Sequence, residues 1–160
     1  MLPLYLLKKK MKNQAELVKS FLSKEECNEL ISYFENNPDQ TEVYLNQSII
    51  LPGPDIQLKN KVIDFVIQAY NVSFNYLQIV KWPNGTFMDN HYDGTVVTDN
   101  DHTCICYLNS DYTGGRTFIQ DKYIDADMGD FLFFNSKNLL HGVETVQGTR
   151  YTMISWYKQL

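Results

Sequence analysis

The hydrophobic pattern of this 160-residue chain changes near residue 74, and the change limits the folds that the chain can adopt. Beyond it, short runs rich in β-branched and aromatic residues alternate with turn signals such as "PNG", "DYTGG", "DMGD" and "VQG". This pattern predicts roughly seven or eight antiparallel strands. The predicted strands lie in "FNYLQIVKW", "GTFMDNHYD", "HTCICYLN", "RTFIQDKYI", "DFLFFN", "LLHGVETV" and "RYTMISWYK".

Two amphipathic helices are predicted ahead of the strands. In "FLSKEECNELISYFENNPD", Ser23 and Glu26 have the spacing of a capping box, apolar residues recur at helical intervals, and Pro38 ends the run. A second helix is predicted in "DIQLKNKVIDFVIQAYN". The intervening "YLNQSIILPGPD" contains two prolines and a glycine and is predicted to be a loop.

Helices followed by strands indicate an α+β fold, in which the helices cover one face of a double antiparallel sheet. We expect a single domain over residues 1–160, with a helical N-terminal part at about 15–72 and a strand-rich core at about 73–158. The opening "MLPLYLLKKKMKN" has an apolar run too short for a bilayer, followed by basic residues. We therefore expect a first strand and a basic turn there, and no targeting segment.

Charge and cysteine content limit the classes of partner that the protein is expected to bind and the cellular compartment in which it is expected. The 14 basic and 19 acidic residues leave a net charge of −5, which argues against a surface for polyanions. We expect neither a nucleic-acid nor a membrane partner. The three cysteines are odd in number and lack the spacing of a disulfide framework, which indicates free thiols and a cytoplasmic protein.

A candidate metal site begins at "HYDGTVVTDNDH", where His91 and Asp93 can project to one face at a strand end. His141, on a later strand, is the natural third ligand of a 2-His-1-carboxylate set, the type found in non-haem Fe(II) oxygenases. Arg150 opens the last strand nine residues after His141, and its guanidinium can bind the far carboxylate of a dicarboxylate. Tyr107 offers a hydroxyl to the same pocket.

A second metal site in "HTCIC" is rejected on distance. His102 and Cys106 start roughly 13 Å apart on a strand, whereas metal–ligand bonds are only about 2.0–2.3 Å long. Alternation along the strand instead directs Thr103, Ile105 and Tyr107 into the barrel and the cysteines outward beneath the helices.

Taken together, these motifs resemble the 2-oxoglutarate- and Fe(II)-dependent dioxygenases, and especially their prolyl 4-hydroxylase-like branch. The resemblance covers roughly residues 20–158 and rests on H-x-D…H with an arginine nine residues after the second histidine. It also rests on "FLSKEECNELI", "KWPNGTFMDNHYD", "YLNSDYTGGRTFI", "GDFLFFNS" and "LLHGVETVQGTRYTMISWY". It implies a double-stranded β-helix, or jelly roll, with the N-terminal helices packed on its major sheet.

The resemblance also assigns roles to residues of the pocket. The implied iron ligands are His91, Asp93 and His141; the implied cosubstrate contacts are Arg150, Tyr107 and Trp82; the implied substrate contact is Trp156. Trp82 lies one residue out of register with a pocket tyrosine of the relatives. The implied cofactor is Fe(II), with 2-oxoglutarate and O2 as cosubstrates, and the family also suggests ascorbate.

The implied reaction is hydroxylation of a substrate C–H bond with release of succinate and CO2. We expect the target to be a prolyl residue in a protein or peptide. A free amino acid or other small molecule is an alternative substrate. A non-catalytic metal-binding jelly roll is a further alternative, but it would not need Arg150 and Tyr107. A nucleic-acid demethylase would be expected to carry a second arginine where Trp156 stands.

Two residues depart from the pattern of the resembling enzymes. Collagen-type relatives usually carry lysine at the position of Arg150, and the residue after "GG" is usually acidic or apolar, where this chain has Arg116.

The segments "TEVYLNQSIILPGPD" and "GTVVTDND" are predicted to form mobile rims at the mouth of the site, because they are polar or rich in Pro and Gly.

Overall fold

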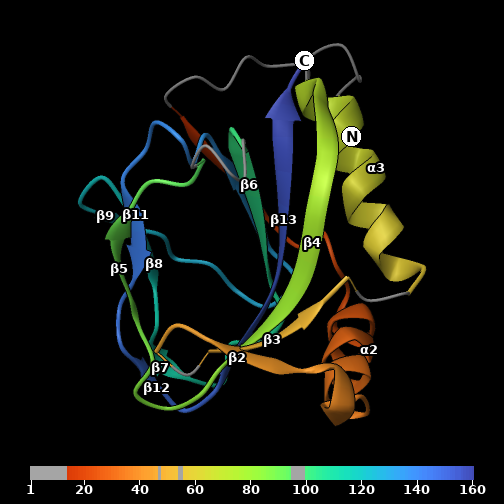
Figure 1. The fold of residues 1–160 in the computed structure, drawn as a ribbon, viewed down its shortest axis with the longest axis vertical. Coiled ribbons are helices and arrows are strands. Elements are labelled where there is room, and N and C mark those ends of the chain that lie inside the picture. The colour runs from red at the N-terminus through yellow and green to blue at the C-terminus, as the bar shows by residue number, and fades with distance from the viewer. Residues whose placement is uncertain (1–13, 47, 54–55, 95–99) are drawn as a thin grey trace.

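Two antiparallel sheets face each other in the computed structural model, which describes residues 14–46, 48–53, 56–94 and 100–160 (Figure 1). The strand predicted within residues 1–13 and most of the rim "GTVVTDND" lie outside these residues. The larger sheet has seven strands in the order β1 (Ala15–Val18), β10 (Phe131–Phe134), β6 (His102–Tyr107), β13 (Arg150–Gln159), β4 (Val72–Trp82), β3 (Ser48–Pro52) and β2 (Glu42–Tyr44).

The smaller sheet completes the double-stranded β-helix predicted from the sequence. Its four strands follow the order β5 (Met88–His91), β11 (His141–Val143), β8 (Thr117–Ile119) and β9 (Lys122–Tyr123). A separate two-stranded ribbon joins β7 (Thr113–Gly114) to β12 (Val146–Gln147). The two sheets are not closed into a continuous barrel, because no strand pairing joins the larger one to the smaller one among the described residues.

The two predicted helices are confirmed and lie on the outer face of the larger sheet (Figure 1). Helix α2 (Lys24–Glu35) has the predicted capping box, since Ser23 Oγ accepts from the Glu26 N–H and the Glu26 carboxylate accepts from the Ser23 N–H. A short 3-10 turn follows at Pro38–Gln40. Helix α3 (Leu58–Tyr70) buries Val62 and Val66 against the sheet.

The prediction of a loop at "YLNQSIILPGPD" is wrong. Among its described residues, Tyr44 ends β2 and Ser48–Pro52 form β3, which pairs with β4 on one side and with β2 on the other. Leu51 is fully buried beneath the helices, while Ile50 faces the smaller sheet. Burial of alternate residues on opposite faces outweighs the turn signals, because Pro52 occupies only the last position of the strand. The N-terminal part thus contributes strands as well as helices.

The hydrophobic core divides into two layers, one on each face of the larger sheet. Strand β6 confirms the predicted alternation, because Cys104 and Cys106 pack beneath the helices with Cys27, whereas Ile105 and Tyr107 lie between the sheets. All three cysteines are free thiols. None of the described helices is long and apolar enough to span a bilayer.

Candidate metal centre

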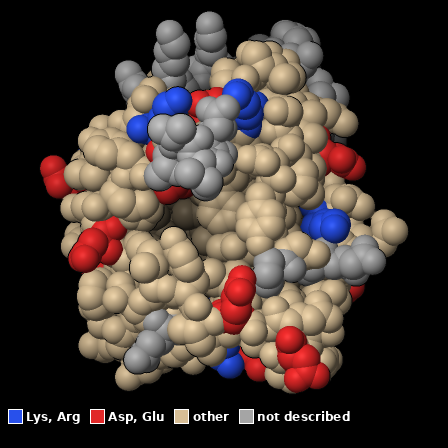
Figure 2. Space-filling model, in the orientation of Figure 1, with Lys and Arg blue, Asp and Glu red and all other residues tan. Residues whose placement is uncertain are grey.

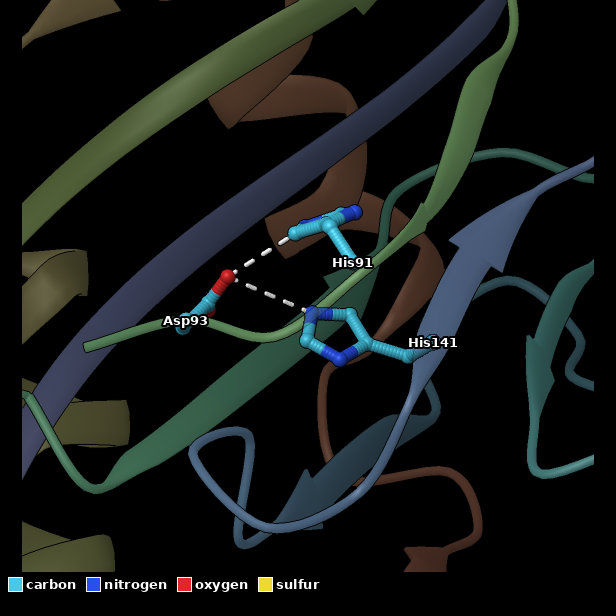
Figure 3. Close-up of side chains that lie close together, drawn as sticks. All are labelled: His91, Asp93 and His141. Atoms are coloured by element: carbon cyan, nitrogen blue, oxygen red, sulfur yellow. Dashed lines mark ion pairs between the residues drawn. The ribbon is translucent and has the colours of Figure 1, made fainter. Parts of the chain in front are cut away.

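The structure brings His91, Asp93 and His141 together between the two sheets (Figure 3). His91 ends β5, and His141 begins β11 and is its direct partner across the strand pair. The Nε2 atoms of His91 and His141 lie 3.2 Å and 3.3 Å from Asp93 Oδ1. One candidate ligand atom from each of the three residues lies within 4.8 Å of the others, which suits a single metal ion.

Backbone carbonyls fix both histidine rings in the same tautomer. The Nδ1 of His91 lies 2.8 Å from the Asp89 carbonyl, and the Nδ1 of His141 lies 2.8 Å from the Leu139 carbonyl. Since a carbonyl only accepts, each Nδ1 carries a proton and a neutral ring has its lone pair on Nε2. Two lone pairs and the Asp93 carboxylate therefore converge, and a cation satisfies all three acceptors together.

Asp93 is ionised at neutral pH. Burial alone raises the pKa of its carboxyl, but hydrogen bonds from His141 and His91, whose Nε2 atoms donate only when the rings are protonated, and from Thr103 outweigh burial and hold the pKa well below its usual range. Thr103 Oγ1 lies 2.9 Å from Asp93 Oδ2, and Trp156 Nε1 donates to the same oxygen at 3.1 Å. Trp156, predicted as a substrate contact, thus lies directly against the candidate trio of His91, Asp93 and His141.

Arg150 lies fully inside the protein with part of its guanidinium unsatisfied. It is 1% exposed, and its Nη2 donates to Thr117 Oγ1 at 3.1 Å. Its Nε and Nη1 have no hydrogen-bond partner among the described residues. Buried donors and buried charge both favour an anionic ligand, so the predicted anion site has the chemistry of a carboxylate pocket.

Tyr107 and Trp82 form the walls around this guanidinium. The Cζ of Arg150 lies 4.8 Å from the Trp82 ring centre and 5.6 Å from that of Tyr107. The Tyr107 hydroxyl lies 2.7 Å from Thr117 Oγ1, and burial raises the pKa of Tyr107 to about 12, so the phenol stays neutral and can donate. Trp82 directs its N–H to Thr152 Oγ1 at 3.1 Å, so it contacts the pocket through its ring.

The pocket around Arg150 and the trio of His91, Asp93 and His141 lie a short distance apart along β8 and β11. His141 pairs with Ile119, and Val143 pairs with Thr117, so Thr117 is displaced from His141 by two strand positions. Two strand positions correspond to about 7 Å. This separation is of the order of the length of a five-carbon dicarboxylate, which can reach from the metal to Arg150.

Two functional threonines were not identified as such from the sequence. Alternation along β6 did place Thr103 inside the barrel on the same face as Tyr107, but only the fold brings it to Asp93. Thr117 gave no signal, because its contact with Arg150 joins β8 of the smaller sheet to β13 of the larger one and arises only in the folded protein. The unusual Arg116 lies on the surface and forms an ion pair with Glu144, away from the trio.

A known family matches the half of the chain that holds the candidate site. Residues 77–158 match the 2OG-Fe(II) oxygenase superfamily, and this segment contains every predicted ligand. The chain belongs to the 2OG-Fe(II) oxygenase superfamily. It is a dioxygenase that uses Fe(II) and 2-oxoglutarate, in agreement with its His–Asp–His trio. No curated protein sequence matches this oxygenase.

Solved structures of prolyl hydroxylases share the fold of this oxygenase. A prolyl 4-hydroxylase of Pseudomonas putida has a TM-score of 0.74 at 15% identity, over 91% of this chain and 92% of that chain. A prolyl hydroxylase of Trichoplax adhaerens, in complex with a peptide fragment of the hypoxia inducible factor, has a TM-score of 0.75 at 18% identity, over 92% and 84% of the chains.

A viral enzyme whose structure contains the cosubstrate also shares the fold of this oxygenase. The collagen prolyl hydroxylase of Paramecium bursaria Chlorella virus-1, in complex with 2-oxoglutarate, has a TM-score of 0.71 at 19% identity, over 91% of this chain and 96% of that chain. At such low identities, these likenesses show the fold alone. They confirm the prolyl 4-hydroxylase-like jelly roll of the oxygenase, and the suggested role of ascorbate stays a prediction.

Proposed function

We propose that this oxygenase hydroxylates a prolyl residue in a protein or peptide, with His91, Asp93 and His141 as the iron ligands. In this proposal, Arg150, Tyr107 and Thr117 hold the far carboxylate of 2-oxoglutarate. The observation that carries it is the buried guanidinium of Arg150, whose Nε and Nη1 lack partners among the described residues. A metal-binding jelly roll without catalysis has no need of such an anion site beside its trio.

Each part of the pocket has a separate task in the reaction. Bound ferrous iron and 2-oxoglutarate supply the oxidation of a C–H bond by O2, with release of succinate and CO2. Arg150 orients the cosubstrate from its far end, and the neutral Tyr107 hydroxyl adds a donor beside it. The walls of Trp82 and Tyr107 exclude water from the carboxylate, which strengthens its attraction to the guanidinium.

The wall next to the trio offers an aromatic platform to the substrate. Tyr76 and Trp156 are partners across β4 and β13, and their rings stack with centres 5.9 Å apart at an angle of 19°. Tyr76 is 40% exposed, whereas the Trp156 N–H contacts Asp93. Flat apolar rings suit packing against the carbon atoms of a pyrrolidine, so this platform supports a prolyl substrate.

An exposed apolar surface at the end of the β2–β3 hairpin supports a polypeptide as the substrate. Tyr44 and Leu45 are each more than half exposed, and Phe87 is 37% exposed. The Asn46 amide donates to the Phe87 carbonyl, so the hairpin meets the start of β5. Figure 2 shows a hollow near the centre of this face, with mostly uncharged described surface around it. Contiguous exposed apolar surface is typical of protein contacts.

The test is a turnover assay that separates the substrate classes. Purified protein with Fe(II), 2-oxoglutarate and O2 is incubated with proline-containing peptides, with host-lysate proteins, and with free proline and other amino acids. We expect succinate release to rise with a peptide or protein, which gains the mass of one oxygen atom at a proline. Oxidation of free amino acids alone would support the small-molecule alternative. His91→Ala is the inactive control.

A further inference from the structure

The two oxygens of Asp93 have different surroundings. Oδ1 faces the Nε2 atoms of His91 and His141 at 3.2 Å and 3.3 Å. Oδ2 points away from the histidines and accepts from Trp156 Nε1 at 3.1 Å and from Thr103 Oγ1 at 2.9 Å. Only Oδ1 is therefore directed to the metal position, while Oδ2 is occupied by two donors.

The two donors are held by the larger sheet, opposite the histidines. Trp156 on β13 and Thr103 on β6 are direct partners across the strand pair, so they reach the carboxylate side by side. The Ser136 hydroxyl lies 2.7 Å from Thr103 Oγ1. Because a carboxylate only accepts, the Thr103 proton goes to Asp93 and Ser136 donates to Thr103. The Ser136 carbonyl also accepts from the Asp93 backbone N–H at 2.9 Å.

We propose that Trp156 and Thr103 are positioning residues that keep Asp93 a one-oxygen metal ligand. The proposal rests on the proposed metal centre. A 2-His-1-carboxylate set leaves open coordination positions for the cosubstrates. A carboxylate that turned and bound through both oxygens would occupy one of those positions. The hydrogen bonds to Oδ2 oppose this rotation, so they protect the position that 2-oxoglutarate and O2 need.

Trp156 is held in place from its other side as well. Its ring stacks on Tyr76, which makes no hydrogen bond with Asp93. The stacking and the hydrogen bond can therefore be removed separately. Trp156→Phe keeps an aromatic ring and removes the N–H, whereas Tyr76→Leu removes the stacking partner and keeps the N–H.

The experiment uses Co(II), whose visible absorption reports on coordination number and geometry. Trp156→Phe, Thr103→Val and the double variant are titrated with Co(II), and the loaded proteins are then titrated with 2-oxoglutarate. Loss of partners that orient a metal ligand typically lowers affinity by about 10–100-fold. We expect about a tenfold loss of Co(II) affinity in each single variant and a larger loss in the double variant. We also expect an altered Co(II) spectrum and weaker 2-oxoglutarate binding.

The chain offers a matched control for the tryptophan. The Trp82 N–H donates to Thr152 Oγ1 over the same 3.1 Å, but it does not contact Asp93. Trp82→Phe should therefore keep the Co(II) affinity and the spectrum of the metal-loaded protein without 2-oxoglutarate. Thr103→Ser, which keeps the hydroxyl, should restore most of the affinity that Thr103→Val loses. Tyr76→Leu, which keeps the Trp156 N–H, should lose less Co(II) affinity than Trp156→Phe does, and thermal unfolding checks that each variant is folded.

The outcomes separate this inference from the proposed function. If the wild-type protein binds Co(II) but Trp156→Phe and Thr103→Val retain its affinity and spectrum, the positioning role is wrong and the metal centre stands. If Trp82→Phe loses as much Co(II) affinity as Trp156→Phe, general loosening of the barrel explains the loss, and the positioning role is again wrong. If the wild-type protein fails to bind Co(II), the proposed metal centre itself is wrong. Should Trp156→Phe fail to fold, Thr103→Val decides the question alone.

Discussion

Arg150 is buried without a carboxylate partner among the described residues. A guanidinium loses its hydration on burial, and the described contacts replace that hydration only in part. Thr117 accepts one hydrogen bond, and the rings of Trp82 and Tyr107 lie within cation–π distance. The remaining donors are satisfied when a carboxylate binds, so ligand binding offsets an electrostatic cost already present in the free protein.

The donors of Arg150 that lack partners among the described residues predict the effect of Arg150→Gln. Each hydrogen bond between a charged group and its partner contributes about 1.5–3 kcal/mol. We expect the dissociation constant for 2-oxoglutarate to rise on the order of 100-fold, while Co(II) affinity stays unchanged because Arg150 does not contact the trio. Calorimetry on the Co(II)-loaded protein measures both constants. Arg150→Lys keeps the charge without the fork and should fall between the two. Unchanged 2-oxoglutarate affinity in Arg150→Gln would refute the assignment of the anion site.

His91 predicts how metal binding depends on pH. The hydrogen bond to Asp93 raises the pKa of His91 above its ordinary value of about 6.5. Metal binding needs the neutral imidazole, so protons compete with the metal below that pKa. The pKa of Asp93 lies far lower, so its carboxylate stays ionised. Co(II) affinity should therefore be constant in alkaline solution and fall as the pH drops through the raised pKa of His91. Affinity that is constant or stronger in acid would contradict this.

At the scale of elements, the β2–β3 hairpin is the part of the fold that the sequence pattern misrepresented. Its strand β3 adds Leu51 to the layer beneath the helices and Ile50 to the layer between the sheets. A loop would leave the edge of β4 without a partner and these side chains without a core. The hairpin is therefore an integral part of the larger sheet. Its Val43 and Tyr44 are both exposed and lie on opposite faces of that sheet.

Leu51→Ala tests whether β3 is a packed strand. Leu51 is fully buried, and truncating a buried leucine costs about 2–5 kcal/mol of unfolding free energy. We expect a loss in this range, measured by urea denaturation. Val43→Ala on the same hairpin is the control, because Val43 is 69% exposed and should change stability by less than about 0.5 kcal/mol. A Leu51→Ala variant as stable as the control would show that the segment behaves as a loop.

At the scale of the whole molecule, the candidate site joins the two sheets. The histidines come from β5 and β11 of the smaller sheet, whereas Thr103, Trp156 and Arg150 come from β6 and β13 of the larger one. A metal ion bound by the trio is thus linked to both layers through Asp93. The single domain over residues 1–160 and the cytoplasmic location stay predictions.

Metal binding should therefore stabilise the fold as a whole. A ligand that binds only the native state at about 100 times its dissociation constant adds about 2.7 kcal/mol. For a chain of this size, such a gain raises the melting temperature by roughly 5–10 °C. We expect Co(II) to produce this rise in a thermal melt and a chelator to reverse it. His141→Ala should show no rise; an equal rise in that variant would place the metal elsewhere.

Much of the fold of this protein was predictable from local sequence patterns. The capping box at Ser23 and Glu26 marked the start of α2, and alternation along β6 separated the cysteines from Tyr107. Such patterns can be recognised in a sequence because each depends on a few neighbouring residues and a single backbone period. The resemblance of the motifs also indicated the family, because the motifs are short and contiguous in the sequence.

Other properties depend on contacts between distant segments. The hairpin at β2–β3 was hidden because Pro and Gly signal a turn locally, whereas pairing with β4 and burial of Leu51 decide the conformation. Thr117 meets Arg150, and Thr103 and Trp156 meet Asp93, through side-chain contacts between distant segments that no local pattern encodes. Local patterns were enough to predict the chemical types of the site residues and most of the helices and strands. Which hydrogen-bond donors meet which acceptors was set on folding, because it depends on how strands of both sheets are placed and not on periodicity.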